Sequence, residues 1–228
     1  MFTSSEVNAE VAAMTYLNRP VKVLVGGIGE KSPAAGVLAP GDQLVAVSGR
    51  PVERVAAVYD ALKQTRPGQQ VSITYRRGST ATQTATVTLG SRPDDGPQGF
   101  LDIMPAAEPL NPDEVVIGLT DIGGPSAGLI FALAVIDKLT PGELTGGRFV
   151  AGTGEISQTG EVGRISGIPF KMTAARQAGA TVFLVPEGNC EEAAATAPEG
   201  LQLIKVGNLG QAVAGLDALR EGRPATGC

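Results

Sequence analysis

Hydrophobic and polar positions follow three different rhythms along the chain. Residues 3–17 place apolar side chains on one helical face, begin with hydroxyl residues that can cap a helix, and end before Pro20. Proline cannot continue a helix interior, because it lacks the amide hydrogen and clashes with the preceding turn. The pattern therefore predicts a single helix ahead of the first strand.

Residues 21–89 alternate short β-branched runs with turn signals. Within them, residues 55–64 have helical spacing, whereas 68–78 and 80–89 alternate with the two-residue period of paired strands. The pattern predicts a small β-rich module with one main helix. Residues 90–99 are rich in Gly, Pro and Asp, which is typical of a linker.

Strand and helix patterns alternate through the rest of the chain. Residues 113–119 favour a strand, and residues 127–139 are apolar around nearly the whole helical circumference, which predicts a buried helix. Residues 168–178 form another helical pattern, with Pro169 in its first turn and Gly179 just past its end. A strand, a helix, a strand and a helix capped by Asn208 are predicted to follow. This order indicates an α+β fold.

Composition excludes several kinds of chemistry. The chain has no histidine, so it has no Ser-His-Asp or Cys-His site and lacks the commonest transition-metal ligand. We therefore expect no metal and no cofactor. The formal net charge of −5 argues against nucleic acid as a partner. No Walker-type loop of the pattern G-x-x-x-x-G-K-[ST] is present, so we expect no ATP-driven step.

Two cysteines, Cys190 and Cys228, are too few for a disulfide framework. A single bridge and two free thiols both fit the sequence, and we favour two free thiols. A catalytic cysteine is disfavoured because no histidine is available to activate it.

The stretch "GGPSAG" places Ser126 on a bare backbone immediately before the apolar helix. Unpaired amides at a helix start, together with the helix dipole, can stabilise an oxyanion. We expect the oxyanion hole at Gly124, Pro125 and Ser126. An N-cap serine or an anion-binding loop fits the same residues equally well.

A serine nucleophile in a chain without histidine needs another base, and a neutral lysine can serve. Lowering the pKa of lysine from its usual value of about 10.4 by roughly 3 units costs about 4 kcal/mol, which apolar burial can supply. Lys171 lies in the first turn of a predicted helix, between Phe170 and Met172. It is the candidate base, although a surface lysine that snorkels fits its position too. Such a base predicts activity that rises between about pH 7 and 9.

"GGPSAG" followed by "GIPFKMTAA" resembles the proteolytic domain of Lon-type serine proteases, and "AGTGEISQTGEVGRISGI" and "AGATVFLVPEGNCEE" extend the likeness over residues 98–220. The resemblance implies a Ser–Lys dyad of Ser126 and Lys171, with Thr153 near the lysine. It also implies a homo-oligomer, with hexamers usual in the family. One departure is Gly123, where the family commonly has Asp.

"SPAAGVLAPGDQLVAVSGRPV" resembles a PDZ domain of the bacterial protease type. PDZ domains bind an extended peptide by adding a strand beside their main helix. We expect the carboxylate-binding loop at residues 17–20, although the domain could instead only position or gate the protease. The expected groove residues are Val21, Val23, Val25, Val55, Val58 and Leu62.

The stretch "AAMTYL" resembles a helix found early in the Lon proteolytic domain, which implies that the PDZ domain is inserted. The expected organisation is residues 1–19 as a helix of the protease domain, 20–90 as the PDZ domain, 91–98 as a linker and 99–228 as the proteolytic domain. Proteins of this arrangement follow a membrane anchor and face outward, so we expect an extracytoplasmic soluble fragment.

The sequence thus predicts an ATP-independent serine endopeptidase that cleaves peptides or unfolded proteins. Two rival interpretations remain open. One is a PDZ peptide-binding scaffold whose protease-like half is silent, and the other is a small-molecule hydrolase that uses the same dyad.

Overall fold

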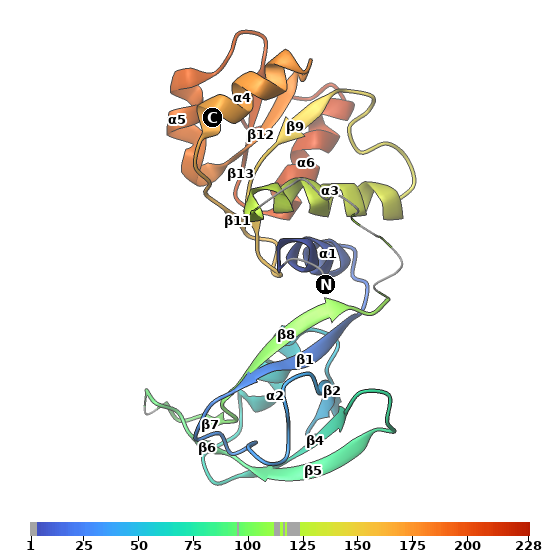
Figure 1. The fold of residues 1–228 in the computed structure, drawn as a ribbon, viewed down its shortest axis with the longest axis vertical. Helices are drawn as coiled ribbons and strands as arrows, with labels where there is room; N and C mark the ends of the chain where they lie inside the picture. Colours follow the sequence, from blue (N-terminus) through green and yellow to red (C-terminus); the bar gives the residue numbers. More distant parts are fainter. Residues whose placement is uncertain (1–3, 95, 112–114, 116, 118–123) are drawn as a thin grey trace. The chain divides into compact units, whose positions relative to one another are not determined.

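A computed structural model of the chain describes residues 4–94, 96–111, 115, 117 and 124–228. The chain divides into two compact units (Figure 1). Unit 1 contains Met1–Arg19 and Asn111–Cys228, and unit 2 contains Pro20–Leu110. The predicted strand at residues 113–119 lies largely outside the described residues, as does Gly123.

The boundary between the units differs from the predicted one. Strand β8 (Ile103–Pro109) pairs antiparallel with β1 (Val21–Ile28), so residues 99–110 belong to unit 2. The predicted linker is part of the same unit, because β6 (Gly90–Ser91) pairs with β7 (Gly99–Phe100). Residues 92–94 and 96–98 lie in turns and bends between these two strands.

Unit 2 is built on one antiparallel sheet with the strand order β5-β4-β2-β1-β8. The strands not yet given are β2 (Gln43–Val47), β3 (Arg50–Pro51), β4 (Gln70–Arg76) and β5 (Gln83–Thr88). The predicted pair at 68–78 and 80–89 is confirmed as β4 and β5, and β3 pairs with β2. Strand β1 is therefore internal, whereas β5 and β8 are edge strands.

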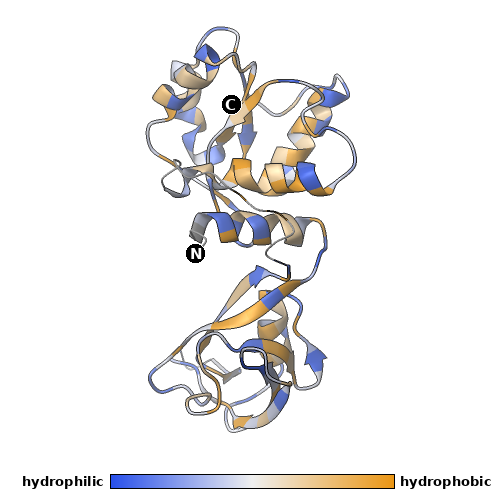
Figure 2. Cartoon of the chain, turned by 45° about the vertical axis from the view of Figure 1, so that its right-hand side comes forward, coloured by the Kyte–Doolittle hydropathy of each residue, from blue (hydrophilic) through white to orange (hydrophobic). Residues whose placement is uncertain are grey.

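Helix α2 (Val55–Leu62) is the helix predicted for unit 2. Its buried Val58, Ala61 and Leu62 join the core of this unit, together with side chains such as Leu44 and Ile73 from the sheet. Hydrophobic residues lie along the strands of this sheet in Figure 2.

Unit 1 contains a parallel sheet of three strands with the order β13-β12-β9. These strands are β9 (Val150–Gly152), β12 (Val182–Pro186) and β13 (Gln202–Val206). Every residue of the central strand β12 is buried, as expected for a strand covered on both faces.

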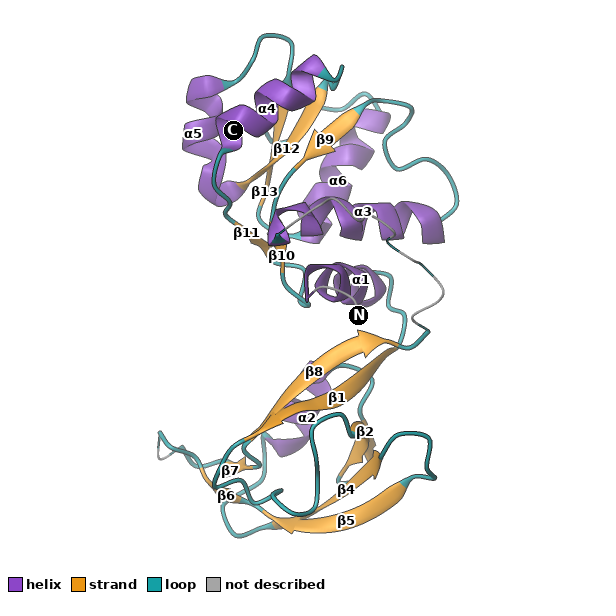
Figure 3. Ribbon diagram, in the orientation of Figure 1, coloured by secondary structure: helices purple, strands orange, loops and turns teal. Residues whose placement is uncertain are grey.

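Alternating side chains of β12 enter two different cores. Val182 and Leu184 pack with α1 (Ser4–Tyr16), α3 (Gly128–Leu139) and α6 (Leu209–Arg220). Phe183 and Val185 pack on the other face with α4 (Ile168–Gln177) and α5 (Cys190–Thr196). This layering, helices on both faces of a sheet, is visible in Figure 3.

Three short elements complete unit 1: the 3-10 turn η1 (Pro125–Ala127), the 3-10 turn η2 (Glu187–Asn189), and a hairpin of β10 (Glu155–Ile156) and β11 (Val162–Gly163). The predicted cap of the last helix is confirmed, because the Asn208 side chain accepts a hydrogen bond from the Gln211 amide at 2.9 Å. No helix in the described part of the chain is both long and apolar enough to span a bilayer.

Cys190 and Cys228 form a disulfide, so the preference for two free thiols is wrong. The bridge joins residues 38 positions apart. Near it, the Lys205 amide in the edge strand β13 donates to the Thr226 carbonyl at 2.9 Å. The segment that ends at Cys228 thus runs beside β13, which the local sequence pattern does not reveal.

Candidate active site

Ser126 lies in η1, directly before the buried helix α3. Its carbonyl oxygen accepts hydrogen bonds from the Gly154 amide at 2.8 Å and from Thr153 Oγ1 at 2.9 Å. The serine backbone is therefore fixed to the loop between β9 and β10. Gly128 permits this close approach, since a Cβ there would lie 2.9 Å from Ile156 Cγ2.

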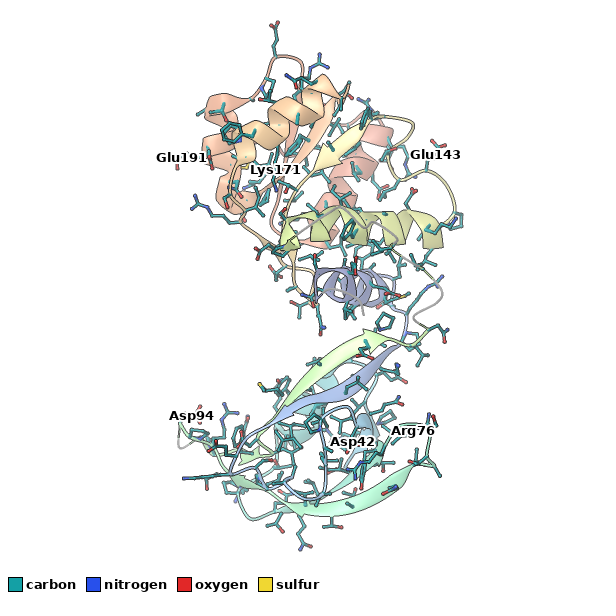
Figure 4. All side chains as sticks on the ribbon, viewed as in Figure 1. Asp42, Arg76, Asp94, Glu143, Lys171 and Glu191 are labelled. Carbon is teal, nitrogen blue, oxygen red and sulfur yellow. A yellow bond between two sulfur atoms is a disulfide. The ribbon has the colours of Figure 1, made fainter. Side chains whose placement is uncertain are left out.

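Lys171 lies in the first turn of α4, as predicted. The helix starts after Gly167, whose φ of 74° places it in the left-handed region that favours glycine. The Lys171 amide donates to the Gly167 carbonyl at 3.2 Å. Figure 4 labels Lys171, which projects from α4 within unit 1.

The structure brings Ser126, Thr153 and Lys171 together. Lys171 Nζ lies 2.8 Å from Ser126 Oγ and 3.1 Å from Thr153 Oγ1. Thr153 is buried, with 3% of its surface exposed, and its proton is directed to the Ser126 carbonyl. Its oxygen lone pair is therefore available to the lysine amine.

Ser126 and Lys171 border an open pocket of about 550 Å³. Its wall includes Pro125 and Ile165, but also three exposed charged residues: Glu155, Arg164 and Glu192. Within the described residues none of these three forms an ion pair, so their charges face the pocket contents and solvent. The sequence pattern gave no reason to single them out.

The neighbours of Lys171 do not enclose it as the sequence predicts. Phe170 is 82% exposed, and the buried Met172 belongs to the core between α4 and the sheet. Adjacent residues on a helix point in directions about 100° apart, so chain neighbours rarely share one environment. The amine is instead surrounded by the Ser126 and Thr153 hydroxyls and the pocket wall.

The predicted oxyanion hole needs a correction at Pro125, which has no amide hydrogen and cannot donate. Gly124 and Ser126, on either side, retain their amides. Gly124 has a φ of 88°, so this turn, too, uses backbone geometry that side-chain-bearing residues rarely adopt.

The predicted peptide groove of unit 2 is wrong in its strand. Val21, Val23 and Val25 lie in β1, which is paired with β2 on one side and β8 on the other. An added peptide strand needs a free edge, and β8 provides one.

A small cleft of about 50 Å³ lies where α2 meets the loop and strand at residues 98–105. Val58, Tyr59 and Leu62 of α2 border it together with Phe100 and Ile103. Val58 and Leu62 were predicted in the groove and do border it, whereas Val55 is absent from its lining. The loop at its end is formed by residues 98–102 rather than by 17–20.

Across the described ranges, no three Cys, Asp or Glu side chains cluster closely enough to hold a metal ion.

Two protein families match the chain. Residues 5–89 match the PDZ domain, and residues 115–215 match the Lon protease (S16) C-terminal proteolytic domain.

Curated relatives match about a third to two fifths of the chain. Lon protease of Clostridioides difficile is 42% identical over 79 residues, which is 35% of this chain and 10% of that protein. Lon protease of Rhizobium meliloti is 34% identical over 100 residues, or 42% of this chain and 12% of the relative. The chain thus spans about a tenth of the length of these relatives.

Solved structures with similarity include PDZ domains of SdrC-like proteins. The one from Listeria monocytogenes is 24% identical, with a TM-score of 0.33, and covers 36% of this chain and 85% of its own. The one from Listeria innocua is 22% identical, with a TM-score of 0.33, and covers 37% and 92%.

Proposed function

We propose that this chain, which combines a PDZ domain with a Lon-type (S16) C-terminal proteolytic domain, is a serine endopeptidase with Ser126 as nucleophile and Lys171 as general base. A proteolytic domain of this family implies a serine peptidase. The observation that supports these two residues is the 2.8 Å separation of Lys171 Nζ and Ser126 Oγ.

The proposed reaction begins with proton transfer from the Ser126 hydroxyl to the neutral amine of Lys171. The 2.8 Å contact serves both protonation states, because a neutral amine accepts from the hydroxyl and an ammonium donates to the oxygen. The serine oxygen attacks the peptide carbonyl, and the amides of Gly124 and Ser126 stabilise the resulting oxyanion.

The lysine then gives its proton to the leaving amine, and an acyl-enzyme forms. The same lysine, now neutral, deprotonates a water molecule that attacks the ester carbonyl, and the ammonium then returns the proton to the Ser126 oxygen as the ester bond breaks. Thr153 Oγ1, at 3.1 Å, orients the amine throughout.

We further propose that the substrates are flexible peptides or unfolded proteins, and that no ATP is consumed. The sequence has no Walker-type G-x-x-x-x-G-K-[ST] loop, and the pocket is open to solvent. The PDZ domain would bind such segments or gate their access, using β8 and α2 rather than β1. We also propose that the proteolytic domains assemble into a homo-oligomer, a hexamer being usual in this family.

The disulfide supports an extracytoplasmic location, because such bridges persist in oxidising compartments. We also propose that a segment outside this sequence anchors the protein to a membrane.

The test combines a fluorophosphonate probe with an unfolded casein substrate and no ATP. The parent chain should label and cleave. Ser126→Ala should do neither, and Lys171→Ala should lose on the order of 10³-fold or more in rate. Equal labelling of parent and Ser126→Ala would overturn the assignment, and a parent that binds peptides but neither labels nor cleaves would indicate a silent scaffold. Cleavage of a small ester without cleavage of casein would indicate a small-molecule hydrolase.

A further inference from the structure

We propose that Asn189 is a positioning residue for Lys171, acting through the backbone of Ile165. This inference rests on the proposed function of the Ser126–Lys171 pair. It concerns a residue that does not touch the reacting atoms.

Asn189 is a polar side chain in the interior, with 1% of its surface exposed. It is the last residue of η2, between the central strand β12 and helix α5. Its side-chain amide makes a reciprocal pair of hydrogen bonds with one residue. Nδ2 donates to the Ile165 carbonyl at 2.9 Å, and Oδ1 accepts from the Ile165 amide at 2.9 Å.

Ile165 needs this partner because it lies in the irregular segment between β11 and α4, beyond the last strand pair of the hairpin. Its backbone is buried, and buried amide and carbonyl groups must be satisfied. The Asn189 side chain therefore supplies the two hydrogen bonds that a neighbouring strand would otherwise make with the Ile165 backbone. Only one orientation of the amide satisfies both bonds, so the segment is fixed in register as well as in place.

The segment so fixed leads directly to the lysine. Ile165, Ser166 and Gly167 border the catalytic pocket, and α4 begins at the next residue. Gly167 accepts the hydrogen bond from the Lys171 amide at 3.2 Å. A displacement at Ile165 is therefore transmitted within two residues to the start of the helix that carries Lys171.

Asn189 itself is held in place by the residues on either side of it. Gly188, next to Asn189, packs under Arg164, and a Cβ at Gly188 would lie 3.3 Å from Arg164 Cβ. Cys190, on the other side, is bonded to Cys228. Asn189 thus has little freedom to follow the pocket wall if that wall moves.

If Asn189 only stabilised the fold, its replacement would leave kcat and KM of the folded protein unchanged. A positioning residue changes the Lys171 to Ser126 geometry, and a misplacement near 1 Å is enough to slow catalysis by about 100-fold. For Asn189→Ala we expect kcat on unfolded casein, and the rate of fluorophosphonate labelling, to fall by at least about tenfold. KM should remain within about twofold of the parent, because the pocket wall still binds substrate.

Asn208→Ala is the matched control, because it removes the same side chain from the same unit and breaks one hydrogen bond to the Gln211 amide. This variant should keep parent kcat, KM and labelling rate. Asn189→Asp keeps the acceptor for the Ile165 amide but turns an oxygen toward the Ile165 carbonyl. Its kcat should lie between those of the parent and Asn189→Ala.

All kinetic measurements are made at a temperature at which circular dichroism shows that each variant is folded. If Asn189→Ala fails to fold, Asn189→Asp decides the question alone. Parent kcat and labelling in the folded Asn189 variants would overturn the inference while leaving the serine peptidase proposal intact. If the parent neither labels nor cleaves, the proposed function fails first.

Discussion

The hydroxyl of Thr153 donates to the carbonyl oxygen of Ser126 at 2.9 Å and accepts from Lys171 Nζ at 3.1 Å. One buried side chain thereby ties the backbone of the proposed nucleophile to the amine of the proposed base. The two functional groups come from different elements, η1 and α4, and the loop after β9 joins them.

This relationship predicts a specific effect of Thr153→Val, which keeps the size of the side chain and removes both hydrogen bonds. We expect kcat to fall by about ten- to a hundredfold, because the amine loses its orientation. Thr153→Ser keeps the hydroxyl and should remain within a few-fold of the parent. Steady-state kinetics on a peptide substrate provide the measurement. Parent kcat in Thr153→Val would show that the lysine is oriented by other groups.

Gly128→Ala should damage the site through packing. Alanine normally favours a helix, but here its Cβ would lie 2.9 Å from Ile156 Cγ2 and 3.2 Å from the Ile156 backbone nitrogen. The start of α3 must move away from β10, which costs about 1–3 kcal/mol in the free energy of unfolding and displaces Ser126. Chemical denaturation and probe labelling should both report the change. A variant as stable and as reactive as the parent would show that the β10–β11 hairpin moves to accommodate the added methyl group at no cost in stability.

Local sequence patterns are informative about the dyad because each partner sits in a recognisable local setting. Ser126 follows glycines before an apolar helix, and Lys171 follows a proline in a helix start. Helix α2 and the paired strands β4 and β5 also follow from periodicity, because one face of each is buried. Helix α3 follows from its nearly continuous apolar surface, and α4 from the proline and glycine at its ends.

Long-range pairing could not be predicted in the same way. The hydrophobic alternation in β1 is compatible with either an edge or an internal strand, so the sequence alone does not distinguish Val21–Val25 from β8 as the strand beside a bound peptide. The same limit applies to the Cys190–Cys228 bridge and to residues 99–110. In each case the partner lies far along the chain, and nothing in the local pattern identifies it.

The corrected groove predicts where peptide binding is lost. Ile103→Arg places a long charged side chain in the cleft between β8 and α2, and should weaken binding of a labelled apolar peptide by at least about tenfold, as burying an unpaired charge is costly. Thr86→Arg adds the same side chain to an exposed position of the opposite edge strand, β5, and should leave the affinity unchanged. Fluorescence anisotropy measures both. Loss of binding in Thr86→Arg, with binding retained in Ile103→Arg, would show that the peptide binds along β5 instead of β8.

Acid should weaken unit 2 through Asp42. This carboxylate is 1% exposed and accepts bonds of 2.8 and 2.7 Å from the Arg77 guanidinium (Figure 4 labels Asp42). The hydrogen bonds from Arg77, opposed by burial and aided by the Ala39 amide, lower the pKa of Asp42 below its usual value of 3.8. A lowered pKa contributes stability above the unfolded-state pKa, and that contribution disappears as the pH falls through the folded-state value.

Asp42→Asn removes this contribution at nearly constant volume. The variant should be less stable than the parent at pH 7, and the difference should shrink as the pH falls below about 4. Calorimetry of the full chain between pH 7 and 2.5 measures both proteins under the same conditions. A difference that is constant over this range would show that charge on Asp42 plays no part.

The Cys190–Cys228 bridge should make the stability of unit 1 depend on redox conditions. It closes a separation of 38 residues, and loops of that size are stabilised by up to about 4 kcal/mol, mainly because the cross-link restricts the unfolded chain. Cys228→Ser should therefore lower the melting temperature of the oxidised protein. Dithiothreitol should lower the parent to the same value and leave Cys228→Ser unchanged. If dithiothreitol lowers the melting temperature of both proteins equally, or of neither, the bridge does not hold the segment beside β13. If only the parent responds, residues 223–228 are fixed to the edge of the sheet by this bond.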